Sequence, residues 1–351
     1  MSTTFFFGAF MLLIILMLAL DLGVFHKQDH VIKMKEAAVW TVIWISLALL
    51  FSLIIRFHAE WVHGITSMEE LLAVVKGTDM ESLVRPGMDY ATAIEAYRKE
   101  MTNQYIAGYF LEKSLSIDNI FVMIMIFVSF GVDKKYYHRV LFWGILGAIV
   151  LRLVFIFGLG ALISKFSWVL AIFGFILIYS GIKMFKDDGD EEIDTEKHPV
   201  VRFASKHFNV SPKMDGHNFF TKINGKRYMT PLFLVLIIIE GSDIIFAVDS
   251  IPAVFSVTTD PFIVCFSNIF AIMGLRSLFF LMSDITDKFW LLKYGLGVLL
   301  CFVGVKMLLH EFFHISMPTK LSLIVILAVL FGSIILSLIF SKKCTPKSDV
   351  N

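Results

Sequence analysis

Long apolar runs follow one another along most of the chain and predict its secondary structure. Each run approaches the roughly 20 residues that a helix needs to cross about 30 Å of hydrocarbon. We expect membrane-spanning helices near residues 5–25, 37–57, 105–130, 139–163, 167–185, 231–257, 262–282, 289–309 and 319–340. The pattern therefore predicts an all-α polytopic membrane protein with about nine transmembrane helices.

The composition agrees with a location in the membrane. Of 351 residues 57% are hydrophobic, and the mean hydropathy is +0.78. A soluble domain of this length could not cover so much apolar surface with polar groups, so we expect membrane lipid as the surrounding partner. The net charge of +1 gives no reason to expect a nucleic-acid partner. The three cysteines have neither paired nor metal-binding spacing.

Lysine and arginine residues gather in alternate loops between the predicted spans. One side of the membrane receives the loops around Lys27 and Lys134, the long linker 186–230 and the C-terminal tail. The opposite side receives the segment 58–104 and three short turns. Because cytoplasmic loops carry the excess of basic residues, the N-terminus is expected outside and the C-terminus in the cytoplasm. The acid run DDGDEEID in the linker is interpreted as part of a solvated connector.

Two segments of the chain repeat the same spacing of carboxylates. EKSLSIDNIF places Glu112 and Asp118 six residues apart, and DIIFAVDSIP places Asp243 and Asp249 at the same interval. Downstream, FWGILGAIVLR and FSNIFAIMGLR each end in an arginine, and SGIKMF and VGVKML close the two units. An odd number of spans inverts the next copy, so two three-helix units predict a pseudo-two-fold axis in the membrane plane.

The repeat divides the chain into five parts. They are two N-terminal helices with an outer segment, a first three-helix repeat, a cytoplasmic linker, a second three-helix repeat, and a last helix with a cytoplasmic tail. Their expected bounds are 1–104, 105–185, 186–230, 231–309 and 310–351.

Acidic side chains lie deep inside several of the predicted spans. A carboxylate near the bilayer centre costs about 2.5–3.5 kcal/mol on insertion scales, so it persists when it is paired, hydrated or bound to a cation. The deep acids are Glu112, Asp118, Glu240, Asp243 and Asp249, with Asp21 as a further candidate. Pairing with Arg152 and Arg276 would lock helices together, but the acids outnumber these two arginines. The surplus of negative charge favours a cation site.

The second acidic segment also contains residues that disturb a helix. Gly241 and Ser242 precede Asp243, and Pro252 removes a backbone donor. We therefore expect the helix over 231–257 to be kinked or unwound, with freed carbonyls beside the carboxylates, as in many transporters. Asn119 and the serine after Asp249 add neutral oxygens. Such oxygen ligands suit manganese, calcium or magnesium.

HEFFH, from His310 to His314, matches the HExxH pattern of zinc proteases. Here the pattern straddles the end of a predicted span and a short outer turn, so no catalytic activity is expected. The two histidines remain candidates for a metal site at the outer mouth, with interfacial histidines as the alternative. No nucleotide-binding motif occurs, so any transport would be driven by an ion gradient or the membrane potential.

EKSLSIDNIFV and EGSDIIFAVDSIPAVF, each followed by an arginine-bearing span, resemble the paired signatures of the TerC family. Similarity to its Alx-like members extends through ALDLGVF, KEAAVW and KMLLHEFFHISMPTKLSL over nearly the whole chain. The resemblance implies an integral inner-membrane protein related to the lysine-exporter superfamily. Members are associated with manganese export, with metal loading of exported proteins and with tellurite resistance. The acids implied are Glu112, Asp118, Glu240, Asp243 and Asp249, with Asn119 beside Asp118.

These observations predict a secondary transporter that exports a divalent cation, manganese, without a permanently bound cofactor. Asp118 and Asp249 are expected as central ligands, and Glu112 and Asp243 as ligands or proton-coupling groups. Arg152 and Arg276 would hold or gate the carboxylates. A non-transporting scaffold for stress-response partners and a calcium transporter remain as alternatives.

Overall fold

The computed structural model describes most of the chain. The described residues are 3–25, 34–166, 168–186, 210–211, 214–216, 218–223, 226–283, 291–315 and 317–340. The acid run 187–194, Cys344, the basic C-terminal tail and the side chain of Asp21 lie outside this description.

Nearly all of the described chain is helical. The long helices are α1 (Thr3–Phe25), α2 (Met34–His58), α5 (Tyr90–Ser129), α6 (Lys134–Lys165), α7 (Val169–Lys186), α9 (Pro231–Phe255), α10 (Pro261–Ile272), α11 (Leu275–Ser283), α12 (Leu292–Phe313) and α13 (Thr319–Ile339). By length and composition five of the described helices can cross a membrane, or six if the bent pair α10–α11 is one span. The all-α polytopic class is confirmed, whereas the count of nine spans and the five domain bounds stay predictions.

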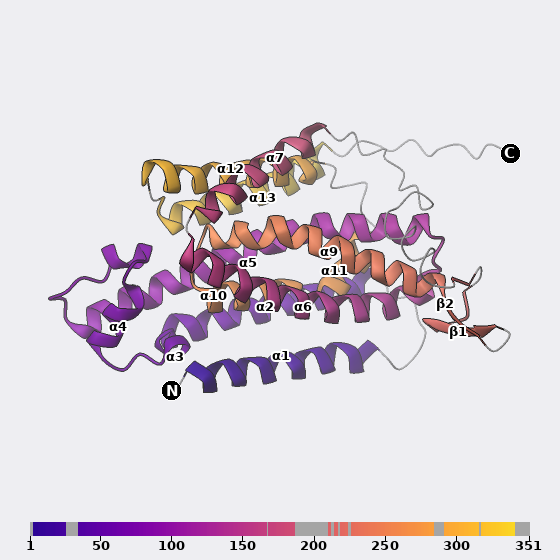
Figure 1. Ribbon diagram of the computed structural model, residues 1–351, viewed down its shortest axis with the longest axis horizontal. Helices are drawn as coiled ribbons and strands as arrows, with labels where there is room; N and C mark the ends of the chain where they lie inside the picture. Colours follow the sequence, from indigo (N-terminus) through magenta and orange to yellow (C-terminus); the bar gives the residue numbers. More distant parts are fainter. Residues whose placement is uncertain are drawn as a thin grey trace.

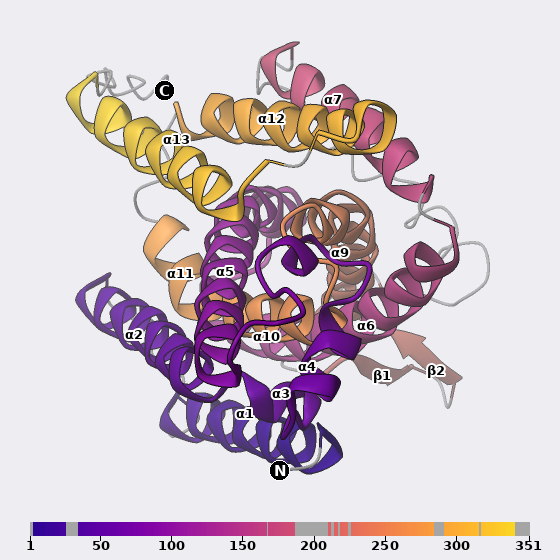
Figure 2. The same cartoon turned by 90° about the vertical axis from the view of Figure 1, so that its left-hand side faces the viewer.

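The long helices run side by side along one axis (Figure 1). Seen end-on, α5, α9 and α10 lie near the middle, with α1 and α2 on one side and α7, α12 and α13 on the other (Figure 2). The outer segment forms α3 (Glu60–His63), α4 (Met68–Val75) and the 3-10 turn η1 (Asp79–Ser82). We call these three elements the cap. In Figure 1 the cap lies at the opposite end of the helices from the strands, as the predicted alternation of sides requires.

The linker contains a small hairpin that the sequence analysis did not predict. Strands β1 (Phe220–Ile223) and β2 (Lys226–Met229) pair antiparallel. The centroid of the Phe220 ring lies 4.6 Å from that of the Phe233 ring on α9. The guanidinium of Arg227 lies over the Phe220 ring, 4.5 Å from its centroid. Aromatic packing of this kind fixes the hairpin to the end of α9.

The helix over 231–257 is not unwound, so that part of the expectation was wrong. Helix α9 is continuous over Pro231–Phe255 with Pro252 inside it, where the missing N–H removes only the bond to the carbonyl four residues earlier. The break falls in the next span, where α10 and α11 meet at 42°. Met273 is extended and Gly274 has φ of 78°, a left-handed conformation that favours glycine. A Cβ on Gly274 would also lie 2.6 Å from the indole of Trp44.

The third helices of the two predicted repeats, α7 and α12, cross through four glycines. A Cβ on Gly304 would lie 2.6 Å from the carbonyl oxygen of Gly174, and one on Gly181 would lie 2.7 Å from that of Gly297. The glycines are seven residues apart on each helix and pair in reversed order. This close approach of backbones is the kind that small residues permit between membrane helices. The reversed pairing is what an inverted relation between the repeats requires.

We expect Gly304→Ala to destabilise the protein, because the obstacle to the added methyl group is backbone on α7. Overpacking typically costs about 1–3 kcal/mol, against at most about 1 kcal/mol gained from the helix propensity of alanine. Gly158→Ala on α6 is the matched control, since nothing lies within 4 Å of its Cβ position. The melting temperatures of both variants would be measured by thermal unfolding in detergent. Equal melting temperatures would contradict the close backbone contact between α7 and α12.

Candidate functional site

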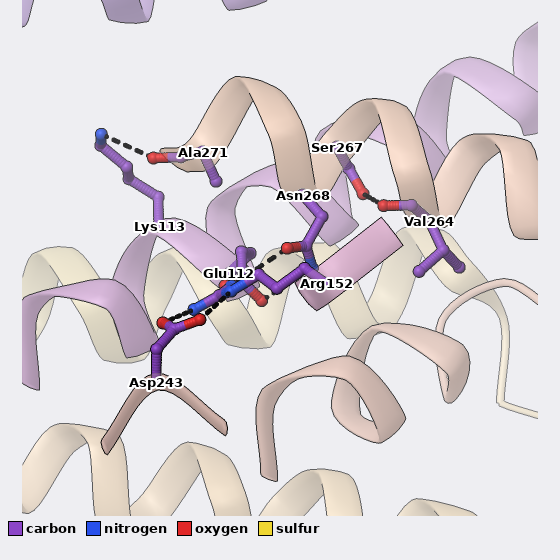
Figure 3. A network of polar contacts seen from close by, with 8 residues as sticks. All are labelled: Glu112, Lys113, Arg152, Asp243, Val264, Ser267, Asn268 and Ala271. Carbon is purple, nitrogen blue, oxygen red and sulfur yellow. Dashed lines mark hydrogen bonds and ion pairs between the residues drawn. The ribbon is translucent and has the colours of Figure 1, made fainter. Parts of the chain in front are cut away.

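A buried arginine links two of the predicted acids from the two repeats. Arg152 on α6 donates from Nε and Nη2 to the carboxylate of Asp243 on α9, at 3.2 and 2.9 Å. Its Nη1 donates to Glu112 Oε1 on α5 and, at 3.0 Å, to Asn268 Oδ1 on α10. Asn268 Nδ2 donates to Glu112 Oε2 at 3.1 Å and closes the ring. Figure 3 shows the four side chains converging from four helices.

All four residues are essentially inaccessible, with exposed fractions between 0 and 2%. Two carboxylates and one guanidinium occupy this cluster, so each acid has a charged partner. The bidentate geometry between Arg152 and Asp243 is the strongest form of such a contact. The alternative of structural charge pairing therefore applies to Glu112 and Asp243, whose oxygens are already engaged. We call this group the Arg152 cluster.

The approach of α10 to α5 brings Asn268 into the cluster. A Cβ on Gly108 would lie 2.9 Å from Ser267 Oγ, so the glycine leaves room for α10. Next to Glu112, Lys113 extends to the end of α10 and donates from Nζ to the carbonyl of Ala271 at 3.1 Å (Figure 3). This carbonyl is one of the last of α10 and has no partner within the helix, so the ammonium supplies its hydrogen bond. The positive charge also interacts favourably with the negative C-terminal end of the helix dipole.

The other predicted pair, Asp118 and Asp249, lines a separate pocket. The pocket is small and partly open, with a volume of about 30 Å³, and is also lined by Asn119, Ser250 and apolar side chains of α5, α7, α9 and α12. Ser180 Oγ donates to Asp249 Oδ1 at 3.2 Å. Asn119 Nδ2 and Ser250 Oγ are buried and have no hydrogen-bond partner within the described structure. We call this the aspartate pocket.

The aspartate pocket gathers oxygen atoms of the types that hard dications prefer. It offers two carboxylates, an amide and hydroxyl groups, a set suited to manganese, magnesium or calcium. Lys293 on α12 lies within electrostatic range of Asp118, so the pocket is not purely anionic. One negative charge remains in excess when both aspartates and Lys293 are ionised.

Among the described contacts, Arg276 and Glu240 do not join either group. Arg276 Nη1 contacts His138 Nε2 at 2.9 Å, and since arginine only donates, this nitrogen is the acceptor. Glu240 lies against α6, where its carboxylate occupies the space that a side chain on Gly147 would need. Its Oε2 is buried without a hydrogen-bond partner among the described atoms. The structure thus divides the six predicted ligands into two groups and one separate glutamate.

The HEFFH motif does not form a continuous helical pair. His310 belongs to α12, but His314 is its C-cap, with φ of 54°. Two histidines on one helical face are what the zinc-protease pattern requires. No group of three or more His, Cys, Asp or Glu side chains able to hold a metal occurs in the described ranges.

Four polar residues of these groups were missed from the sequence. Lys113 is adjacent to Glu112 and could have been counted among the deep bases. Asn268 lies in the same FSNIFAIMGLR segment as Arg276, so it carried a weak signal. Ser180 and Lys293 carried no sequence signal, because a single serine, or a lysine near the end of a span, is common in membrane helices.

The fold and the two buried groups define a polytopic integral membrane protein with carboxylates at the interface of two helical units. The chain belongs to the TerC family of integral membrane proteins, whose model matches residues 97–345. The resemblance predicted from the paired signatures is therefore confirmed. No solved structure matches the chain.

Several relatives align with almost the whole chain. An uncharacterized membrane protein of Myxococcus xanthus is 43% identical over 98% of this chain and 95% of its own length. The "Putative membrane-bound redox modulator Alx" of Escherichia coli K12 is 40% identical over 99% of this chain and 97% of its own length. The protein of the same name from Photorhabdus laumondii is 42% identical over 92% of each chain.

Arg152→Gln is expected to destabilise the protein by about 3–5 kcal/mol, because it leaves two buried carboxylates without their cation. Removing one of those charges as well, in Arg152→Gln with Asp243→Asn, should recover part of the loss. Arg98→Gln is the matched control. Its bidentate partner Glu60 lies in the cap, partly exposed, where such pairs contribute about 0–1 kcal/mol. The loss of stability would be measured by thermal unfolding. An equal loss for Arg152→Gln and Arg98→Gln would contradict the conclusion that Arg152 is the required partner of two buried carboxylates.

Proposed function

We propose that the protein is a secondary transporter that exports a divalent cation, with manganese as its substrate. The aspartate pocket would hold the ion between the two three-helix units. Asp118 and Asp249 would be its charged ligands, and Asn119 and Ser250 would supply neutral oxygens. The pairing of two equivalent aspartates, one from each unit, in one pocket is the observation that carries this proposal.

The contrast between the two buried groups supports a cation as the substrate. In the Arg152 cluster an internal guanidinium already neutralises the acids, so a metal ion would have to displace it. In the aspartate pocket the orphaned hydroxyl oxygen of Ser250 would bind the ion or its water, and the orphaned Nδ2 of Asn119 would donate to a water bound to the ion. A partly hydrated dication bound by two carboxylates is the usual mode for small hard ions.

The Arg152 cluster would act as the fixed element of the transport cycle. It joins α5, α6, α9 and α10, so it ties the first unit to the second at one point. Alternating access by rocking of two repeats requires such a pivot beside the ion site. Glu112 and Asp243 would then support the transporter by positioning its helices, and exchange of a proton for the metal would involve the aspartate pocket or Glu240.

The proposed location is the inner membrane, with the N-terminus outside and the hairpin in the cytoplasm. Exported proteins that receive the metal would be the partners outside. The scaffold alternative draws support from the Arg152 cluster alone, and it gives no role to the aspartate pocket. The Alx relatives are named as redox modulators, and cysteine thiols are one kind of group that could take part in such a role. In the described part of the chain Cys265 and Cys301 are both unpaired, and Cys265 is buried.

Cells that express this protein should contain less manganese and tolerate more of it than cells without it. Asp118→Asn and Asp249→Asn should each abolish both effects, since either change removes a charged ligand. Glu69→Gln is the matched control, because Glu69 lies exposed on α4 of the cap. Cell manganese would be measured by elemental analysis at equal protein levels.

Retained manganese export in both aspartate variants would overturn the proposal. Calcium export by the wild type without manganese export would keep the pocket and change its substrate. In sealed vesicles, collapsing the proton gradient should stop metal movement if a proton is exchanged for the ion, whereas unchanged flux would exclude such coupling.

The proposed orientation predicts opposite labelling of the two ends of the molecule. Glu69→Cys in the cap should react with a membrane-impermeant maleimide on intact spheroplasts. Lys222→Cys in β1 should react only in inverted vesicles. The unsubstituted protein gives the background from its own cysteines, and the reverse pattern of labelling would invert the orientation.

A further inference from the structure

We propose that His63 and Asp260 form a second metal-binding site, at the contact between the cap and the loop that joins α9 to α10. Its ligand would be a divalent cation of the first transition row, such as Mn²⁺. The inference deepens the proposed function and rests on it for the identity of the ion. The site lies outside the membrane-spanning helices and includes none of the acids discussed above.

The two side chains come from distant parts of the sequence and meet directly. His63 Nε2 lies 2.7 Å from Asp260 Oδ2, and their exposed fractions are 20% and 10%. Burial disfavours the charged imidazole, but the hydrogen bond and charge of Asp260 outweigh it and raise the pKa of His63. Asp260 Oδ1 is engaged separately, since it accepts from the backbone of Phe262 at 2.9 Å and caps α10. Oδ2 therefore remains directed at the imidazole.

Both groups are held in place by their surroundings. The ring of Phe262 meets the imidazole of His63 edge-on, with centroids 5.6 Å apart. The cap itself is fixed to α5 by the bidentate contact between Arg98 and Glu60. Metal ligands whose orientation is set by neighbouring contacts bind more tightly than mobile ones.

The pair opens onto a pocket large enough for a hydrated ion. The pocket is partly open, with a volume of about 200 Å³, and its lining includes His63, Asp260, Gln104 and Thr258. Thr258 Oγ1 donates to Gln104 Oε1 at 2.6 Å, and Oε1 keeps a second lone pair. One nitrogen, one carboxylate oxygen and one amide oxygen thus border a single space, and water would complete the coordination.

One buried hydroxyl on α5 lacks a hydrogen-bond partner among the described atoms. Tyr97 on α5 is wholly buried, and its hydroxyl makes no hydrogen bond within the described structure. Burial raises the pKa of Tyr97 well above its usual range, and the charges of Asp260 and Glu60 add to this effect. Tyr97 therefore lies within electrostatic range of Asp260. A water molecule at the site, whose oxygen accepts from the hydroxyl, would explain this orphaned donor.

The imidazole gives this site a selectivity that the aspartate pocket lacks. Nitrogen ligands favour transition metals, whereas all-oxygen sites accept magnesium and calcium as well. On the outer face, such a site would receive transition dications leaving the aspartate pocket and bind magnesium or calcium weakly. The competing role is a metal-free latch, in which the His63–Asp260 contact only fastens the cap to the second unit.

Magnetic resonance of Mn²⁺ bound to the purified, full-length protein in nanodiscs distinguishes these roles. The starting protein carries Asp118→Asn and Asp249→Asn, which remove the charged ligands of the aspartate pocket. It should still bind Mn²⁺ with a hyperfine coupling to an imidazole nitrogen. His63→Gln in the same background should remove this coupling and weaken binding by at least about tenfold. His58→Gln is the matched control, since His58 is the last residue of α2 and stacks on Trp61 of the cap.

A variant that should bind Mn²⁺ more tightly keeps the proposal testable even if His63→Gln disturbs the folding of the cap. Gln104→Glu can still accept from Thr258 and adds a carboxylate, so it should tighten Mn²⁺ binding by about tenfold. Absence of a nitrogen coupling in the starting protein, or its persistence in His63→Gln, would overturn the second site. Loss of manganese export in the aspartate variants tests the aspartate pocket alone, so each proposal can fail without the other.

Discussion

The guanidinium of Arg152 is the charge on which the arrangement of the helices depends. It lies deep among membrane helices and binds Glu112 and Asp243, while Asn268 bonds both Arg152 and Glu112. None of these groups can meet water, so each needs the others in place before the helices that carry them can pack. The second unit therefore has a defined position relative to the first.

Because the acids of the Arg152 cluster are already paired with a guanidinium, the carboxylates of the aspartate pocket are the ones left to bind an external cation. Asp118 and Asp249 are partly buried, and beside them Asn119 Nδ2 and Ser250 Oγ lack hydrogen-bond partners within the described structure. Two groups with the same residue types thus differ in their chemistry, because one contains its counterion and the other is open to an external one. A transporter needs both properties, a rigid reference and a site that can be filled and emptied.

The sequence was sufficient for the membrane class and the nearly all-α fold, because hydropathy is a local property. It was insufficient for the partners of the deep carboxylates. Arg152 and Arg276 occupy equivalent positions in the two repeats, yet one binds acids and the other contacts His138. The break at Gly274, where an added Cβ would meet the indole of Trp44, likewise depends on packing rather than on local pattern. For the same reason the meeting of His63 with Asp260 could not be predicted.

The glycines of α7 and α12 make a surface that is complementary to its own inverted copy. Gly174 meets Gly304 and Gly181 meets Gly297, so each helix presents the same two notches to the other. Contacts of this type are isologous, as in a two-fold dimer. A single three-helix unit with this spacing could have paired with an identical unit inserted in the opposite direction. Duplication and fusion of one gene would then have preserved an interface that already existed between separate chains.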